Sequence, residues 1–315
     1  MAAPWLSILM PVHLGAEWLA ETLASVAREP NEGIELLILD SSPNDSCAKI
    51  VAQFEKRLRI RYRQTPDILA WPAKTNIAAS EARGAHIAML HQDDLWLPGR
   101  IATIRRALAA WPEAVLFLNP SQIVDGSGRV MGLWRCPLAK NVELNTATVA
   151  ERLIVQNFVA IPSPVIRRQT WLDVGGMDEG LWYTADWDLY LKVAGQGCTV
   201  YLPEITTAFR IHQGSLTVQG SRNGAAFREQ MEIVIDRHGH LVPTGVRTRI
   251  LKTARASAAI NVALAATAHG QRMGIAKAAW ALLTLGPAEI GRYVRNSRLH
   301  ERVLPRLRAK MAGAL

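Results

Sequence analysis

Short apolar runs alternate with helix-like segments through the first 120 residues of the chain. The runs are continuous rather than alternating, as expected for strands buried on both faces, and turn-forming residues bound them. Between them, apolar residues recur at helical spacing, as Trp18, Leu19, Leu23 and Val26 do. This order predicts an α/β fold with a doubly wound, mostly parallel sheet. The predicted strands cover residues 5–12, 34–39, 59–63, 86–90 and 114–118, and the predicted helices 16–30, 46–58, 74–83 and 100–110.

Acidic residues follow two of these strands. Asp40 ends the second strand, and the strand 86–90 leads directly into the acidic turn His91-Gln92-Asp93-Asp94. In doubly wound sheets, ligands bind beyond the carboxyl ends of the strands. We therefore expect a ligand site at this edge of the sheet.

The rest of the chain divides into two parts. Residues 120–210 show a mixed pattern, and Asp125-Gly126-Ser127-Gly128 predicts a hairpin turn. From about Asp236 the strand patterns end, and Ala-rich segments with arginines predict two or three helices, broken near Gly270, Gly286-Pro287 and Pro305. We expect an α/β domain over residues 1–235 and a basic α-helical C-terminal module over 236–315.

Composition excludes global disorder, since 49% of the 315 residues are hydrophobic and 20% are charged. The net charge of +9 is uneven: residues 241–315 hold 13 Lys/Arg and 2 Asp/Glu, so the preceding part carries a small net negative charge. The basic helices are either a solvated face or a surface that rests on an anionic membrane. Charge alone does not support nucleic-acid binding, and we expect none.

Cellular location is predicted from three features. The N-terminus lacks the pattern of a secretory signal, and the longest uncharged apolar stretch of the C-terminal part, 257–268, is too short to span a membrane. The three cysteines have no metal-type spacing and are expected to be free thiols in a reducing compartment. We expect a cytoplasmic protein, with peripheral contact at the inner face of the membrane if the basic helices dock there.

Three groups of motifs follow one another along the chain. They are SILMPVH at 7–13 with LDSSPND at 39–45, NIAASEARG at 76–84 with IAMLHQDDLWLP at 87–98, and GGMDE at 175–179 with ADWDLYLK at 185–192, LPE at 202–204 and RIH at 210–212. In this order they resemble the motifs of the inverting GT-A glycosyltransferases often called family 2, over about residues 5–215. The resemblance implies a GT-A fold and transfer of a sugar from a nucleotide sugar, with a UDP-sugar favoured, to a saccharide or lipid-linked acceptor in surface polysaccharide or glycan biosynthesis.

The resemblance assigns the nucleotide site to the ends of the first two strands. Asp40 stands where the family places a carboxylate that reads the base, a role in which its hydrogen bond is charge-assisted. The alternative is an Asp that caps the following turn. Pro11, Val12 and His13 would line the same pocket, although the family often has Thr and Tyr where Val12 and His13 stand.

Asp93 matches the last residue of the family's Asp-x-Asp signature. The resemblance implies that it binds Mn²⁺ or Mg²⁺, which bridges to the donor's diphosphate. His91 replaces the first Asp of the signature and would contact the ribose or approach the metal, with Gln92 beside it. His212 is implied as a further metal or diphosphate ligand. The alternative is a surface turn in which Asp93 and Asp94 cap the following helix.

Three basic or amide side chains complete the donor site that the resemblance implies. Arg210 would pair with the diphosphate. Lys74 and Asn76 lie on the helix that faces the donor in the family, and Lys74 would contact a phosphate.

Asp186 matches the second residue of the family's Glu-Asp pair, with Ala185 in place of the Glu. The resemblance makes it the catalytic base that takes the proton of the acceptor hydroxyl in a single displacement. Thr184 would cap the helix that runs through Lys192, so that the helix dipole favours an ionised Asp186. Asp188 competes for this role.

Two tryptophans flank the predicted base. Trp182 and Trp187 would stack on an acceptor sugar, or they belong to the core.

Two other functions are compatible with parts of this pattern. An NAD-type oxidoreductase shares the doubly wound fold, but residues 10–15 lack the glycine-rich fingerprint for a pyrophosphate. A non-catalytic nucleotide-sugar-binding or scaffold protein of the same fold stays open, because His91 and Ala185 both replace acids.

Overall fold

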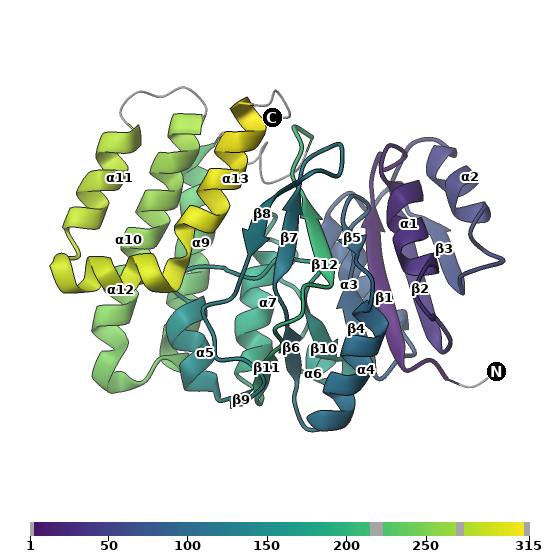
Figure 1. Cartoon of the computed structure of the whole chain (residues 1–315), viewed down its shortest axis with the longest axis horizontal. Coiled ribbons are helices and arrows are strands. Elements are labelled where there is room, and N and C mark those ends of the chain that lie inside the picture. Colours follow the sequence, from purple (N-terminus) through teal and green to yellow (C-terminus); the bar gives the residue numbers. More distant parts are fainter. Residues whose placement is uncertain (1–2, 215–222, 269–273, 312–315) are drawn as a thin grey trace.

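The computed structural model describes residues 3–214, 223–268 and 274–311, and an eight-stranded sheet runs through its centre (Figure 1). The strand order is β3-β2-β1-β4-β10-β6-β11-β9, with β10 and β9 antiparallel to their neighbours and the other pairs parallel. The predicted α/β fold with a mostly parallel sheet is confirmed. The strands are β1 (Leu6–Val12), β2 (Ile34–Asp40), β3 (Ile60–Gln64), β4 (His86–Met89), β6 (Leu116–Leu118), β9 (Glu143–Leu144), β10 (Val165–Arg167) and β11 (Thr199–Tyr201).

Helices cover both faces of this sheet. In β1, Leu6, Ile8 and Met10 pack into one apolar cluster and Leu9 into another, which explains why the strand has no polar face. The first cluster includes α1 (Leu19–Ala27), α2 (Ser46–Ala52) and α4 (Arg100–Ala110), and the second includes α3 (Trp71–Glu81), α5 (Thr146–Leu153), α6 (Arg168–Asp173) and α7 (Ala185–Ala194).

A four-stranded sheet lies beside the carboxyl ends of the central strands. It consists of β5 (Leu95–Trp96), β12 (Thr207–Arg210), β7 (Ser121–Val124) and β8 (Val130–Trp134), in that order. The predicted turn at 125–128 joins β7 to β8, with Gly128 at a φ of 79° and the N–H groups of Ser127 and Arg129 donating to Oδ1 of Asp125. Because β5 directly follows the acidic turn, its pairing with β12 brings residues near 210 beside that turn.

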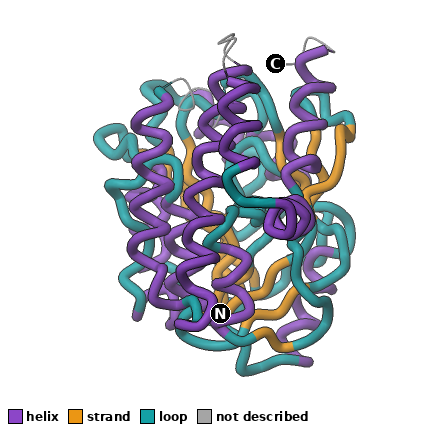
Figure 2. Tube along the Cα trace, turned by 90° about the vertical axis from the view of Figure 1, so that its left-hand side faces the viewer, coloured by secondary structure: helices purple, strands orange, loops and turns teal. Residues whose placement is uncertain are grey.

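The C-terminal helices form a layer that Figure 2 shows from its outer side. Met231 and Val234 of α9 and Ala254 of α10 belong to the same apolar cluster as Leu189 of α7. The boundary expected at residue 235 falls inside α9, and the division into two domains stays a prediction. The elements are α9 (Gly224–His238), the 3₁₀ turn η1 (Gly239–Leu241), α10 (Thr244–Ala268), α11 (Gly274–Leu283), α12 (Pro287–Ser297) and α13 (Leu299–Met311).

The predicted helix breaks have different outcomes. Gly286, at a φ of 80°, and Pro287, in the first turn of α12, do separate two helices. The break near Gly270 lies outside the described residues. The break predicted at Pro305 is wrong, since this proline lies inside α13. It packs closely over Gly132, because a Cβ added at Gly132 would lie 2.7 Å from the proline ring. The described part of the chain beyond Val242 thus holds four α-helices rather than two or three.

Helix α3 begins three residues before its predicted start and ends two residues before its predicted end. Pro72 lies in the first turn of α3, where a backbone N–H would have no partner within the helix, so a proline fits there. After the helix, the N–H groups of Arg83 and Gly84 donate to side chains of Glu35 and Ser7, which draws the chain away from the helix axis. Among the described helices, none has the length and apolar character needed to cross a membrane.

Candidate active site

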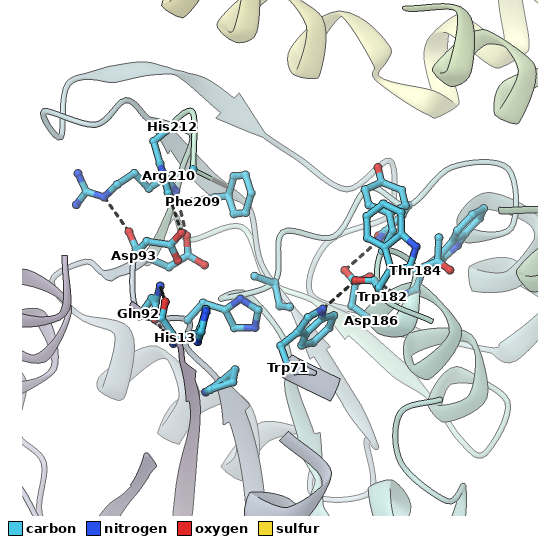
Figure 3. Close-up of a pocket in the computed structure, with 18 of the residues that line it drawn as sticks. His13, Trp71, Gln92, Asp93, Trp182, Thr184, Asp186, Phe209, Arg210 and His212 are labelled. Atoms are coloured by element: carbon cyan, nitrogen blue, oxygen red, sulfur yellow. Dashed lines mark hydrogen bonds and ion pairs between the residues drawn. The ribbon is translucent and has the colours of Figure 1, made fainter. Parts of the chain in front are cut away.

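A cavity of about 630 Å³ lies at the carboxyl ends of β1 and β4 and reaches the first turn of α7 (Figure 3). Its wall contains most of the predicted site residues, and within the described chain it does not include Val12, Asp40 or Asn76. The predicted residues that line it are Pro11, His13, Lys74, His91, Gln92, Asp93, Trp182, Asp186, Trp187, Arg210 and His212.

The acidic turn is held at its backbone. The N–H of Asp94 donates to the carbonyl of His91 at 3.2 Å, which closes the turn. The hydroxyl of Thr22, on α1, lies 2.7 Å from the carbonyl of Gln92 and 2.9 Å from that of Asp94. These bonds fix the direction in which the Asp93 side chain leaves the turn.

The side chain of Gln92 joins the acidic turn to the loop after β1. Its amide accepts from the His13 N–H at 2.7 Å and donates to the His13 carbonyl at 3.0 Å. A Cβ at Gly15 would lie 2.4 Å from the Gln92 Oε1, so this contact requires glycine. Gln92 therefore fixes the loop that bears His13.

Asp93 and His212 form a pair that is open to the cavity. The Asp93 Oδ2 lies 2.9 Å from the His212 Nε2, and the two side chains are 20% and 17% exposed. The β5–β12 ladder sets this pair, because Ala208 is opposite Leu95 and the chain continues from there to His212. Figure 3 shows Asp93 and His212 facing one another.

Arg210 is buried beneath this pair and is bonded on all sides. Its Nε donates to the Asp93 carbonyl at 2.8 Å, and one terminal nitrogen donates to Glu21 at 2.7 Å. The other donates to the carbonyls of residues 125 and 126 at 3.2 Å. The guanidinium also lies 4.6 Å from the ring centroid of Trp18. The diphosphate contact that the resemblance implies for Arg210 stays a prediction; in the structure its guanidinium bonds the backbone of the acidic turn and Glu21.

Burial sets the charge of the groups around Asp93. It lowers the pKa of the His91 imidazole to about 4, so this ring is neutral near pH 7. The His91 Nε2 is enclosed without a hydrogen-bond partner in the described structure, and the ring packs edge-on against Trp71 at 5.2 Å. Burial and the adjacent Asp93 raise the pKa of Asp94 well above its usual value. A neutral His91 does not replace the negative charge of the carboxylate that is missing from the signature.

Lys74 lines the cavity, whereas Asp40 lies behind the cavity wall. The Asp40 oxygens accept from the Ser42 N–H and the Tyr62 hydroxyl, each at 2.8 Å, and the residue is fully buried. The Lys74 Nζ donates to the Val12 carbonyl at 2.6 Å and to the hydroxyl of residue 41 at 2.8 Å. Desolvation lowers the pKa of Lys74 to about 8 despite the nearby Asp40. Base recognition by Asp40 stays a prediction, while the bond to Ser42 matches the turn-capping alternative.

Asn76 does not line the cavity and instead hydrogen-bonds a segment that is distant in sequence. Its amide donates to the Met177 carbonyl at 2.9 Å and to Glu179 at 3.0 Å, and its oxygen accepts from the Met177 N–H. These bonds use both ends of the amide. The Gly-Gly-Met-Asp-Glu motif of residues 175–179 is thus fastened to α3.

Asp186 lies in the first turn of α7, where the helix dipole stabilises an anion. Its Oδ1 accepts from the Trp187 N–H at 2.8 Å and its Oδ2 from the Asn157 amide at 3.1 Å. Thr184 occupies the cap position as predicted, but its hydroxyl donates to the carbonyl of Gln230 instead of to the helix. The helix ends at 194, two residues beyond Lys192.

Asp188, the alternative candidate for the base, is separated from the cavity. It is fully buried and lies outside the cavity wall. Arg237 and His238 bond one oxygen and Lys192 the other, at 2.7 to 2.8 Å. These partners hold its pKa at about 2 against the effect of burial. The geometry therefore favours Asp186, the carboxylate that reaches the cavity.

The aromatic residues near Asp186 differ in exposure. Trp187 is 4% exposed and its indole donates to the Leu153 carbonyl, so it is mainly a core residue. Trp182 is half-buried, and its carbonyl accepts from the Trp71 indole at 2.9 Å. Figure 3 shows Trp71 between the Asp93 and Asp186 groups.

Several residues of the cavity wall lie outside the motifs and could not be predicted from the sequence. Asn157 bonds Asp186, and Gln156 accepts from Ser257 and Asn261 of α10. The partners of Gln156 and Asn157 are distant from them in sequence, and neither residue belongs to a motif. The unpredicted wall residues include Trp18, Trp71, Gln156, Asn157, Tyr183, Met231 and Asn261.

The Asp93–His212 pair fits a divalent cation with two protein ligands. A carboxylate oxygen and an imidazole nitrogen converge there, and cations of this kind commonly complete their coordination with substrate phosphates and water. The described residues include no cluster of three or more His, Cys, Asp or Glu that would hold a metal without such help.

Residues 7–162 match the family model described as Glycosyl transferase family 2. The chain is 23% identical over 214 residues to the uncharacterized protein MT1568 of Mycobacterium tuberculosis, covering 64% of this chain and 66% of that protein. It is 28% identical over 201 residues to the O-antigen biosynthesis protein RfbC of Myxococcus xanthus, covering 61% of this chain and 14% of that protein. The match spans less than two thirds of each of these relatives.

Two solved structures have similar folds. S. aureus TarS 1–349 in complex with UDP-GlcNAc superposes with a TM-score of 0.60 at 13% identity, covering 89% of this chain and 90% of that chain. The mannosyltransferase PcManGT from Pyrobaculum calidifontis, in complex with GDP-Man and Mn²⁺, gives 0.59 at 16% identity, covering 96% and 88%. At these identities the likeness is one of fold, and the predicted GT-A fold is confirmed.

Proposed function

The chain belongs to glycosyl transferase family 2, and on that basis we propose that it transfers a sugar from a nucleoside-diphosphate sugar to an acceptor hydroxyl with inversion. One observation carries the proposal: a single cavity joins the open Asp93–His212 pair to the carboxylate of Asp186. A diphosphate would lie at the first group and the acceptor at the second. The sugar would occupy the space between them, beside Trp71.

Asp93 and His212 would hold Mn²⁺ or Mg²⁺ together with the donor's diphosphate. The cation, when bound, supplies positive charge that stabilises the departing nucleoside diphosphate. Arg210 supports this end indirectly, because it fixes the backbone of Asp93. The neutral His91 would leave a single aspartate in the signature, so we expect modest metal affinity in the absence of nucleotide.

Asp186 would act as the base. The acceptor oxygen attacks the anomeric carbon as the bond from that carbon to the diphosphate breaks, and the hydroxyl proton moves to Asp186. The nucleoside diphosphate leaves with the bonding electrons. Because Asn157 bonds the Oδ2 of Asp186 and the Trp187 N–H bonds its Oδ1, the carboxylate is held in one orientation before the acceptor arrives.

For the donor nucleotide and the acceptor we propose classes of molecule. UDP is the first candidate nucleotide, with GDP and dTDP as alternatives, and TarS and PcManGT were solved with UDP-GlcNAc and GDP-Man respectively. Trp182, half-buried at the Asp186 end, is the better placed of the two predicted tryptophans to stack on an acceptor sugar. A saccharide or lipid-linked acceptor in surface glycan synthesis fits the likeness to RfbC.

A thermal-shift screen tests the proposal. UDP, GDP and dTDP are each added with and without Mn²⁺. A nucleotide at a hundredfold excess over its Kd stabilises the fold by about 2.7 kcal/mol, which raises the Tm by several degrees. We expect one nucleoside diphosphate to stabilise the protein only with metal, and its sugar conjugates to be turned over. No stabilisation by any of them would contradict the proposal, and binding without turnover would favour the non-catalytic alternative.

A further inference from the structure

Helix α11 presents an apolar face to the outside of the molecule. Ile275, Trp280 and Leu283 are 65%, 70% and 65% exposed, and Ala276 and Ala279 between them are exposed as well. At about 100° per residue these five positions share one arc of roughly 140°. Figure 1 shows α11 at the far end of the molecule from β3, with α10 on its inner side.

The opposite side of α11 is also apolar and packs on α10. A Cβ at Gly274 would lie 2.2 Å from the Thr267 hydroxyl, which shows how closely the two helices approach. Ala278 and Leu282 pack against the core cluster. Lys277 is the only charged residue among the ten of this helix. A helix that is apolar on all sides is normally covered, so its outward face indicates an interaction surface.

The positive charge of this part of the chain favours an anionic occupant for the face. Lys277 and, on the adjoining helix α12, Arg295 are exposed and have no ion pair in the described part of the chain. The segment 241–315, which contains both helices, holds 13 basic and 2 acidic residues. A second copy would bring the same positive charge against it and be repelled. An anionic lipid surface would instead accept the cations at its headgroups and the indole and aliphatic side chains at the acyl boundary.

We propose that the outward face of α11, formed by Ile275, Trp280 and Leu283 and flanked by Lys277, docks the protein on the surface of an anionic bilayer. The contact is peripheral, because no described helix can span a membrane. This proposal is independent of the transfer chemistry.

Co-sedimentation of the full chain with vesicles tests this surface. The vesicles are phosphatidylcholine alone, or phosphatidylcholine mixed equally with phosphatidylglycerol, and hold no donor or acceptor. We expect binding to the mixed vesicles that weakens with salt. Trp280→Ser combined with Leu283→Ser should weaken it at least tenfold, and Lys277→Gln about fivefold. Val142→Ser, at a side chain 44% exposed before β9, is the matched control and should bind like the parent protein.

Three outcomes would overturn the inference. The first is equal binding to both vesicle types. The second is unchanged binding by the Trp280→Ser, Leu283→Ser double variant. The third is a dimer in light scattering that the double variant converts to a monomer, which would assign the face to a second copy. Thermal unfolding of each variant confirms that it is folded. Failure of nucleotide turnover would leave the vesicle result unaffected, so the two proposals can fail separately.

Discussion

Replacing Arg210 by lysine separates the two roles that this residue can have. The structure shows its guanidinium with side-chain exposure of 0%, bonded to Glu21 and to three backbone carbonyls. Lysine keeps the charge but reaches only part of this set, because it lacks the planar fork. The unmet carbonyls and the loosened Asp93 turn should therefore lower stability and nucleotide binding together.

The magnitude follows from burial. Hydrogen bonds to a charged group contribute about 1.5–3 kcal/mol each and are not additive. Because lysine cannot reach all three buried carbonyls, we expect Arg210→Lys to lower the free energy of unfolding by about 4 kcal/mol. Glu21→Gln should cost no more than about 1 kcal/mol, because the Glu21 side chain is 49% exposed and water screens the pair.

Urea unfolding and titration calorimetry with a nucleoside diphosphate and Mn²⁺ measure the two quantities on each variant. We expect Arg210→Lys to be destabilised and to bind nucleotide more weakly, and Glu21→Gln to show both effects in smaller degree. The reasoning is refuted if Arg210→Lys keeps the parent stability yet loses nucleotide affinity tenfold while Glu21→Gln changes neither. That result would indicate a direct contact between the guanidinium and the diphosphate.

Three further variants test separate parts of the structure. Asp188→Asn should lower the free energy of unfolding by about 3 kcal/mol in urea, because Lys192 and Arg237 lose a fully buried partner. Asn157→Ala should lower kcat several-fold with the donor KM unchanged, since it removes a bond that orients the base; a change confined to KM would contradict this. Burial lowers the pKa of His86 from 6.5 to about 4, so between those pH values only the unfolded chain gains its proton and stability falls on acidification. His86→Gln should therefore be more stable than the parent by about 2 kcal/mol near pH 4.5 and equal to it near pH 7.5.

The sheet and the order of the site motifs could be predicted because both depend on local patterns. Continuous apolar runs that end at Asp40 and at the acidic turn mark strands whose carboxyl ends meet, and the structure has them as β2 and β4. Gly286-Pro287 likewise separates two helices through local backbone chemistry. The break predicted at Pro305 is wrong: the proline lies inside α13, and it packs over Gly132, a residue distant in sequence that no local pattern indicates.

The bonding state of each site residue could not be predicted, because it depends on partners distant in sequence. Lys74 was expected at a phosphate, but its ammonium bonds a carbonyl 62 residues away. The choice between Asp186 and Asp188 rests on Arg237 and His238, which lie in a segment outside every motif. Sequence spacing placed both carboxylates in one helical turn, and only packing shows which one reaches the cavity.

In the proposed function, one end of the cavity holds the donor diphosphate and the other holds the base. Nucleotide binding with Mn²⁺ and turnover of the matching nucleotide sugar, measured on the parent, Asp93→Ala and Asp186→Asn, test it most directly. We predict that Asp186→Asn binds nucleotide like the parent while turnover falls at least a hundredfold, and that Asp93→Ala loses both turnover and the metal dependence of binding. Normal turnover by Asp186→Asn, or metal-dependent binding that survives in Asp93→Ala, would contradict the account.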